Sequence, residues 1–464
     1  MNTLLVKLLP GIFLIQFLSL SAQEVQTWLT TADRSQLFQL QANKIIFTAV
    51  QDNEPTIFVD DHQKFQTMDG FGCTLTGGSA MLLRQMEVFA RTKLLEELFT
   101  TQNQGIGISY LRISIGASDL DEEVFSYAEV PAGQTDPGLD KFSLLKDQLH
   151  LIPVLKEILA FQPKLKIMAS PWSPPVWMKD NGSSIGGKLK PEYYRVYANY
   201  LVKYIQGMIA FGIPIDAITV QNEPLHPGNN PSLLMPASEQ AVFIRDFLGP
   251  AFKQAKLKTK IIIYDHNADR PDYPIQILND QKARKFIHGS AFHLYGGVVE
   301  TIRQVQEAHP DKDLYFTEQW IGAPADFGGD LGWHTKHLMI GAPRNGCKTV
   351  LEWNLAADAQ QKPHTAGGCT RCLGALTLTG NQVERNPAYY ILAHSSKHVR
   401  PGSVRIASNT VLSLYNIAYR TPEGQKVVLV YNESNEIQQF NLGYRNLKTK
   451  VALPGGAVAT YVWK

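Results

Sequence analysis

The chain has 464 residues, of which 44% are hydrophobic, 10% aromatic and 19% charged. This apolar content is enough for a large folded core, so the composition excludes a disordered, collagenous or coiled-coil protein. The 44 basic and 42 acidic residues nearly cancel, which excludes the broad basic face that nucleic-acid binding needs. A chain of this length is expected to form one large domain with an accessory domain, or two to three small ones.

The N-terminus has the pattern of a secretory signal peptide. A lone Lys7 precedes an apolar run over residues 8–20, and small residues follow it up to Ala22. The run is too short to span a bilayer. We therefore predict that residues 1–22 are a signal peptide cleaved near Ala22, and that the mature protein is secreted or periplasmic with no transmembrane anchor.

Residues 66–395 alternate short β-branched or apolar runs with longer helical patterns. The predicted strands are Gln66–Leu75, Ile108–Ile115, Leu165–Ser170, Ile215–Gln221, Lys260–Asp265, Gly289–Leu294, Asp313–Thr317 and Thr349–Trp353. The predicted helices, with apolar residues at i, i+3, i+4 and i+7, are Ser79–Phe99, Leu144–Ala160, Pro191–Ile209, Glu239–Gln254, Gln276–Phe286, Val299–Ala308 and Leu331–Ile340. Eight strands, each usually followed by a helix, predict an α/β fold with a (β/α)₈ TIM barrel. A doubly wound open sheet is the alternative, but it usually has fewer units.

Residues 396–464 have a different pattern, with short alternating or β-rich runs separated by turns. The predicted strands are Val404–Ile406, Thr410–Tyr419, Gln425–Tyr431, Ile437–Gly443 and Val458–Trp463. Strands at this spacing predict a small accessory β-sandwich. The N-terminal segment 23–65 is strand-like over Val25–Phe47 and is expected to complete that sandwich.

Two glutamates follow strands at the same end of the predicted barrel. Glu223 comes directly after the fourth strand and Glu318 directly after the seventh. Catalytic groups of such barrels lie just past the C-terminal ends of the strands, so both carboxylates are expected to face one cleft. Glycoside hydrolysis needs such a pair, and in a retaining enzyme the two carboxyl groups lie about 5–5.5 Å apart. The alternative for either residue is a glutamate that only interacts with a helix dipole.

Aromatic side chains at the strand ends favour a sugar ligand. Trp172 follows the third strand, Tyr295 the sixth and Trp353 the eighth. Such rings pack on the apolar faces of pyranoses, although an aromatic residue is more often part of the core. His293, in the same run as Tyr295, is expected to form hydrogen bonds rather than to act as a general base.

Seven motifs in this order resemble one known family. They are Gly70-Phe71-Gly72, Arg112-Ile113 with Asp119, Ala169–Trp177, Asn222-Glu223-Pro224, His293-Leu294-Tyr295, Thr317-Glu318 and Trp353-Asn354-Leu355. The chain resembles glycoside hydrolase family 30, the glucosylceramidase-like family that also includes β-1,6-glucanases. The resemblance implies a TIM barrel with a side β-sandwich built from both termini, and a retaining mechanism with Glu223 as acid/base and Glu318 as nucleophile. The substrate-binding residues expected from it are Trp172, Asn222, His293, Tyr295, Trp353 and Asp119.

One position departs from the glucosylceramidase pattern. That pattern usually carries Thr-Asp-Ala after Gly-Phe-Gly, and its aspartate binds hydroxyls of the terminal glucose. Here the run is Thr76-Gly77-Gly78, so Gly77 takes the place of the aspartate and is expected to open the non-reducing end of the site. The sequence therefore predicts an exported retaining β-glycosidase that acts on a β-glucan, with β-1,6 linkages favoured. The alternatives are a glucosylceramidase and a non-catalytic sugar-binding barrel, and the presence of both glutamates argues against the second.

The four cysteines permit few cross-links. Cys369 and Cys372 form a CxxC motif, for which a local disulfide or free thiols are favoured over a zinc site with His364 as a third ligand. Cys73 and Cys347 are expected near opposite ends of the barrel, too far apart to bond. We predict no metal or organic cofactor, no nucleic-acid partner and a monomer.

Overall fold

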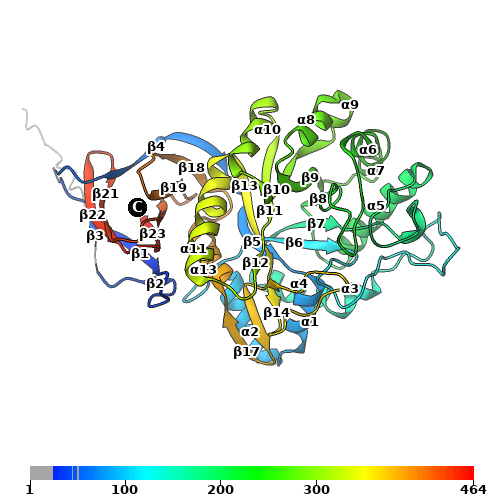
Figure 1. The fold of residues 1–464 in the computed structure, drawn as a ribbon, viewed down its shortest axis with the longest axis horizontal. Helices are drawn as coiled ribbons and strands as arrows, with labels where there is room; N and C mark the ends of the chain where they lie inside the picture. The colour runs from blue at the N-terminus through cyan, green and yellow to red at the C-terminus, as the bar shows by residue number, and fades with distance from the viewer. Residues whose placement is uncertain (1–23, 44, 50–51) are drawn as a thin grey trace, which may run out of the picture.

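The computed structural model describes residues 24–43, 45–49 and 52–464. The predicted signal peptide lies outside this range. Figure 1 shows a barrel surrounded by helices, with a β-rich body beside it that contains both the first described strand and the C-terminus. The predicted combination of a TIM barrel and a β-sandwich is thus confirmed.

Eight parallel strands close the barrel in the predicted order. They are β5 (Gly70–Thr74), β6 (Tyr110–Ile115), β7 (Lys166–Pro171), β8 (Ala217–Thr219), β9 (Lys260–Ala268), β10 (Ile287–Gly297), β11 (Asp313–Glu318) and β13 (Cys347–Asn354). Strands covered by helices outside and by side chains inside are buried on both faces, which explains their continuous apolar runs. A separate cluster of buried side chains fills the interior, one from each strand except β5: Tyr110, Met168, Ala217, Ile262, Ala291, Tyr315 and Leu351.

The helices cover the outside of the barrel. They are α1 (Gly77–Gln85), α2 (Val88–Phe99), α3 (Leu145–Leu149), α4 (Leu151–Phe161), α5 (Tyr194–Ala210), α6 (Ala237–Phe243), α7 (Gly249–Gln254), α8 (Asp272–Asn279), α9 (Gln281–Arg284), α10 (Ile302–Ala308), α11 (Phe327–His334), α12 (Ala342–Arg344) and α13 (Pro387–Ser396). Short 3₁₀ turns lie at η1 (Val176–Met178), η2 (Pro191–Tyr193) and η4 (Val299–Thr301).

Several helices that the sequence predicts as continuous are interrupted. The predicted helix 79–99 is wrong at its centre, because Met86 and the following residue adopt extended backbone angles between α1 and α2. Two π-helical segments, η3 (Ile244–Leu248) and η5 (Thr335–Gly341), each precede a proline. Proline has no N–H for the carbonyl four residues earlier, and the wider π turn accommodates the missing bond.

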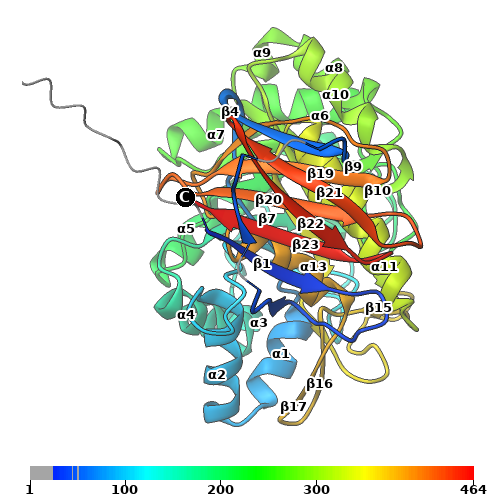
Figure 2. The ribbon, with the colours of Figure 1, turned by 90° about the vertical axis from the view of Figure 1, so that its left-hand side faces the viewer.

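The sandwich combines strands from both ends of the chain, as predicted. Its strands are β1 (Glu24–Thr30), β2 (Gln39–Leu40), β3 (Ile45–Ile46), β4 (Thr56–Thr67), β18 (Val404–Ser408), β19 (Leu414–Arg420), β20 (Lys426–Asn432), β21 (Gln438–Tyr444), β22 (Leu447–Leu453) and β23 (Val458–Trp463). The sequence did not predict β22. Figure 2 shows these strands crossing in front of the barrel.

One face of this sheet packs on the barrel. Along β20, Val427 and Leu429 join the barrel's hydrophobic core, whereas the alternating Val428 and Val430 join the sandwich's own core. His394 of α13 adds polar contacts, with Nε2 2.8 Å from Thr30 Oγ1 and Nδ1 2.9 Å from Thr460 Oγ1. The accessory domain is therefore firmly joined to the wall of the barrel.

Two small sheets lie in the segments after β11 and β13. β12 (Ile321–Gly322) pairs with β15 (Cys372–Leu373), and β14 (Ala356–Ala357) pairs with β16 (Leu376–Thr379), which pairs with β17 (Gln382–Arg385). Cys369 forms a disulfide with Cys372, the first residue of β15, while Cys73 and Cys347 are free and buried. Within the part of the chain that the structure describes, no helix is long and apolar enough to cross a membrane.

Candidate active site

A cavity of about 410 Å³ lies at the C-terminal ends of the barrel strands. It brings together seven of the eight residues that the sequence predicts for the site: Asp119, Trp172, Asn222, Glu223, Tyr295, Glu318 and Trp353. The eighth, His293, is fully buried and contacts Glu223 from behind the cavity wall. Residues far apart in sequence thus converge where barrels of this kind carry chemistry.

Glu223 is held by an unusual backbone conformation just after β8. Its φ of +44° lies in the left-handed region, which an ordinary side chain rarely adopts. Its N–H donates to the Asp265 carbonyl at 2.9 Å, and the N–H of Asn222 donates to the Pro171 carbonyl at 2.8 Å. Strain that surrounding bonds maintain in this way is typical of functional positions.

Glu318 is the last residue of β11, where the strand pairing is irregular. The register between β10 and β11 pairs Phe292 with Phe316 and then His293 with Glu318, so Thr317 is skipped. Both carboxylate oxygens of Glu318 accept hydrogen bonds: Oε2 from Arg112 Nη1 at 2.5 Å and Oε1 from the Tyr295 hydroxyl at 3.0 Å. The guanidinium can only donate, and the Tyr295 hydroxyl donates here, so the geometry fits the ionised carboxylate.

A buried network of charges lies under the two glutamates. Arg112 Nη2 donates to Asp265 Oδ2 at 2.8 Å and to Asn222 Oδ1 at 2.6 Å. Asp265 Oδ1 accepts from Thr317 Oγ1 at 2.6 Å and lies 3.1 Å from His293 Nε2. Because Asn222 uses its amide oxygen here, its amide nitrogen is left to donate to a substrate hydroxyl.

Asp265 reaches this network through a β-bulge. The pairing of β9 with β10 runs from Tyr264 directly to His266, so Asp265 has no partner in the ladder, and its φ is +64°. A bulge redirects side chains at a strand end. Here it places the Asp265 carboxylate against His293 and the His266 ring against Glu223, at the C-terminal end of the barrel.

The two glutamates have different electrostatic surroundings. Burial raises the pKa of Glu223, but His266 Nδ1 at 3.6 Å and His293 Nδ1 at 3.1 Å outweigh burial and hold that pKa below its usual range. Burial raises the pKa of Glu318 above its usual range, although His293 and Arg112 act against the rise. For His293, burial lowers the pKa, but Glu318, Asp265 and Glu223 outweigh burial and raise the pKa to about 9.

In the free site the transferable proton therefore lies on His293. Glu223 itself is held in its ionised form, because the His293 imidazolium lies against its carboxylate. The 3.1 Å contact leaves this proton one transfer away from Glu223 Oε1.

His293 Nδ1 also limits the separation of the glutamates. It lies 3.1 Å from Glu223 Oε1 and 3.8 Å from Glu318 Oε1. These two oxygens are therefore at most about 7 Å apart, near or below the lower end of the roughly 6.5–9.5 Å separation of inverting enzymes.

The aromatic residues differ in how much of each ring reaches the cavity. Trp172 and Trp353 stack with ring centres 5.5 Å apart and expose only 1% and 4% of their surface. The Arg112 guanidinium lies 4.8 Å from the Trp172 ring centre. Tyr295 is 39% exposed, and Trp320, which the sequence analysis missed, also lines the cavity. Trp172 and Trp353 therefore form a rigid wall, whereas Tyr295 offers the larger accessible surface.

Asp119 lies next to the disulfide on the cavity wall. The Cys369 N–H donates to Asp119 Oδ2 at 3.3 Å, and Cys369 and Cys372 both line the cavity. Burial, with a smaller contribution from the charge of Glu318, raises the pKa of Asp119 to about 7. The CxxC motif thus contributes a wall of the site as a disulfide.

Comparison with known proteins identifies the family. The description "Glycosyl hydrolase family 30 TIM-barrel domain" matches residues 68–399, and "Glycosyl hydrolase family 30 beta sandwich domain" matches residues 402–461. The chain belongs to glycosyl hydrolase family 30. The predicted family is confirmed, and the protein is a glycoside hydrolase.

Relatives in this family differ in substrate. An endo-1,6-beta-D-glucanase of Neurospora crassa is 34% identical over 393 residues, which cover 80% of each chain. A lysosomal acid glucosylceramidase of Mus musculus is 27% identical over 431 residues, covering 87% of this chain and 82% of the relative. The solved structure of the endo-beta1,6-glucanase BT3312 superposes with a TM-score of 0.87 at 34% identity, covering 95% of this chain and 99% of that one.

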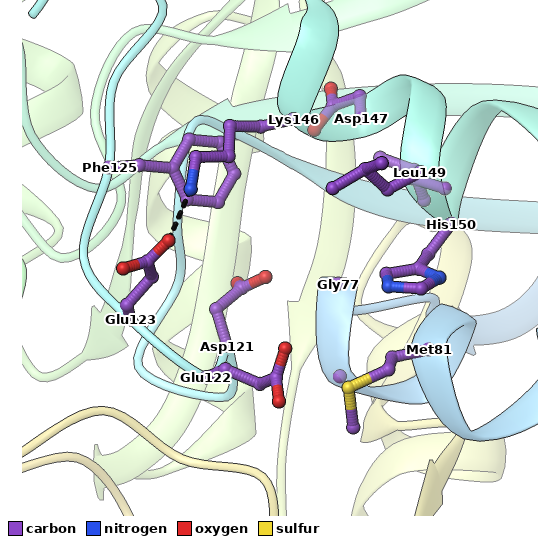
Figure 3. Close-up of a pocket in the computed structure, with 12 residues that line it drawn as sticks. Gly77, Met81, Asp121, Glu122, Glu123, Phe125, Lys146, Asp147, Leu149 and His150 are labelled. Carbon is purple, nitrogen blue, oxygen red and sulfur yellow. Dashed lines mark hydrogen bonds and ion pairs between the residues drawn. The ribbon is translucent and has the colours of Figure 1, made fainter. Parts of the chain in front are cut away.

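The surroundings of Gly77 differ from the sequence-based expectation for this family 30 enzyme. A Cβ at Gly77 would lie 1.7 Å from Asp121 Oδ1, so the Asp121 carboxyl already occupies that space. Figure 3 shows Asp121 beside Gly77 in a separate cavity of about 90 Å³. Asp121 Oδ2 is fixed there by the N–H of Ser118 at 2.7 Å and its hydroxyl at 2.9 Å. The expectation that this glycine opens the sugar site is therefore wrong: it makes room for Asp121.

Several polar members of the site were not predicted as site residues. Arg112 and Asp265 lie in the buried network, and His226, Asn229, His266 and Asn267 line the cavity. A signal for three of them was available, because the polar run Asp265-His266-Asn267 begins at the last residue of the fifth predicted strand, where barrels of this kind carry their chemistry. Arg112 lies within a strand, and only the family motif marked it.

Proposed function

We propose that this family 30 enzyme is exported and hydrolyses β-1,6-glucan with retention of configuration. The observation that carries the choice of substrate is Asp121 in the space beside Gly77, which leaves no room for the glucose-binding aspartate of the glucosylceramidase pattern. The similarity to two endo-1,6-β-glucanases, each at 34% identity, supports the same choice. Export rests on the signal-peptide pattern of residues 1–22.

In the proposed first step Glu318 attacks the anomeric carbon. Its two hydrogen bonds, from Arg112 and Tyr295, keep the carboxylate oriented, and the Arg112 guanidinium opposes the rise in its pKa that burial causes. Glu223 protonates the leaving oxygen, and the proton comes from His293 Nδ1 across the 3.1 Å contact. Bond formation at Glu318 removes its negative charge as the leaving group departs.

In the second step Glu223 acts as a base toward water. Water attacks the glycosyl-enzyme ester from the face that the leaving group occupied, and Glu318 is released as a carboxylate. The proton that Glu223 takes from water returns to the pair that it forms with His293. Two inversions at the anomeric carbon give net retention.

A substrate panel tests the proposal. The purified enzyme is incubated with linear β-1,6-, β-1,3- and β-1,4-glucans and with glucosylceramide, and Glu318→Gln serves as the inactive control. We expect reducing ends to be released from the β-1,6-glucan at a rate at least tenfold above any other substrate. Preferential hydrolysis of glucosylceramide would identify the enzyme as a glucosylceramidase instead, and a lack of turnover on the β-1,6-glucan would contradict the proposed substrate.

A further inference from the structure

Three nitrogen and oxygen atoms at the inner end of the cleft have the spacing of metal ligands. Glu223 Oε1 lies 3.1 Å from His293 Nδ1 and 3.6 Å from His266 Nδ1, and one ligand atom from each residue lies within 4.8 Å of the others. Tetrahedral Zn²⁺ with bonds of about 2.0–2.1 Å needs ligand atoms roughly 3.3 Å apart. The separations of 3.1 Å and 3.6 Å therefore lie on either side of the ligand spacing of roughly 3.3 Å that Zn²⁺ needs.

The surroundings of these atoms also match a zinc site. His293 Nε2 lies 3.1 Å from Asp265 Oδ1, and a metal-binding histidine usually donates its second ring N–H to a carboxylate in this way. His266 Nδ1 is buried and has no hydrogen-bond partner among the residues that the structure describes. A metal ion would supply the partner that this nitrogen lacks.

Charge and access favour a cation as well. Three carboxylates, from Glu223, Glu318 and Asp265, face only two cationic groups, the Arg112 guanidinium and the His293 imidazolium. The site is therefore negative when all three carboxylates are ionised. Glu223 and His266 line the cavity of about 410 Å³, which gives an ion a path from solvent and leaves a fourth coordination position for water.

We propose that Zn²⁺, or a divalent cation of similar softness, binds reversibly to Glu223, His266 and His293 and inhibits the enzyme. The ion takes the lone pair on His293 Nδ1, whose proton leaves to solvent, and it occupies the Glu223 oxygen that hydrolysis requires. It is an inhibitor and not a cofactor. Mg²⁺ and Ca²⁺ prefer all-oxygen ligand sets and do not bind here with comparable affinity.

Direct binding tests this proposal independently of catalysis. Untagged, EDTA-dialysed enzyme is titrated calorimetrically with ZnCl₂, and Co²⁺ is added separately to detect the visible bands of a tetrahedral site. We expect one Zn²⁺ per chain, with binding weakened at least tenfold by His266→Ala and by the nearly isosteric Glu223→Gln. Circular dichroism checks that both variants fold. Hydrolysis by the wild-type enzyme should fall with added Zn²⁺, recover with EDTA and be unaffected by Mg²⁺.

The chain provides its own matched control. The structure holds a second candidate group, Asp60, Asp61 and His62 of β4, on the exposed surface of the sandwich. His62→Ala should leave Zn²⁺ binding and inhibition unchanged. Binding that survives in both site variants, or that disappears in His62→Ala, would overturn the proposal. So would the absence of Zn²⁺ binding to the folded wild type, whatever its activity on β-1,6-glucan.

Discussion

Asp119 provides a quantitative test of the electrostatics of the cleft. Its side chain is almost fully buried, and its pKa rises from an ordinary value of 3.8 to about 7, mainly through burial and secondarily through the charge of Glu318. A raised folded-state pKa means that the ionised form is disfavoured in the folded protein. The associated stability is fully present below the unfolded-state pKa and is lost as the pH rises through about 7. A shift of roughly three pKa units corresponds to about 4 kcal/mol.

Asp119→Asn removes this titration with almost no change in shape, and its amide oxygen can still accept the N–H of Cys369. The variant should match the wild type in unfolding free energy near pH 4 and exceed it by about 4 kcal/mol at pH 8. Urea unfolding followed by tryptophan fluorescence at both pH values measures the difference. Because the variant loses a carboxylate of the sugar site, its KM for the glucan should rise even as stability increases.

The control is Asp140→Asn, which neutralises an exposed carboxylate in a loop. This variant should show no comparable gain at pH 8. A stability difference for Asp119→Asn that is equal at the two pH values, or larger at pH 4, would refute the assignment of a buried, raised-pKa carboxyl.

Four further variants test the roles of the two glutamates, the disulfide and Arg112. Glu223→Gln should slow hydrolysis of substrates with poor leaving groups far more than hydrolysis of an activated aryl glucoside, and with added azide it should give a β-glycosyl azide. Glu318→Gly should give the α-glycosyl azide. If NMR shows the opposite pattern, the roles of the two glutamates are swapped. Cys369→Ser opens the disulfide on the cavity wall, so KM for the glucan should rise several-fold while kcat for a small aryl glucoside changes little. An equal loss of activity on the glucan and on the aryl glucoside would indicate general misfolding. Arg112→Gln leaves Asp265 buried without its cation and should cost about 3–5 kcal/mol in urea unfolding; a cost below about 1 kcal/mol would contradict the role of this ion pair.

The sequence predicts most of the barrel because its strands are buried on both faces and read as apolar runs. Both glutamates follow from one rule, that chemistry lies past the C-terminal ends of the strands. That rule uses chain position alone, so it holds for Glu223 and Glu318 without knowledge of any contact.

What the sequence does not predict depends on local irregularity or on contacts distant in the chain. The polar run that begins at Asp265 marks the end of the apolar part of β9, but nothing in it indicates the bulge that turns the Asp265 side chain inward. The space beside Gly77 is filled by Asp121, 44 positions away, so a glycine that seems to open a site instead makes room for another side chain. The pKa order of the two glutamates depends on how closely His266 and His293 approach each carboxylate, and the strand-end rule gives no such distances.

The stereochemistry of hydrolysis tests the central proposal most directly. Proton NMR, recorded within minutes of adding enzyme to linear β-1,6-glucan, reports the anomer that forms before mutarotation. Because Glu318 is proposed to form a covalent glycosyl-enzyme that water then opens from the opposite face, the new reducing ends should appear first as the β-anomer, with the α-anomer growing in later. If the α-anomer appears first, the enzyme inverts configuration and Glu318 is not the nucleophile.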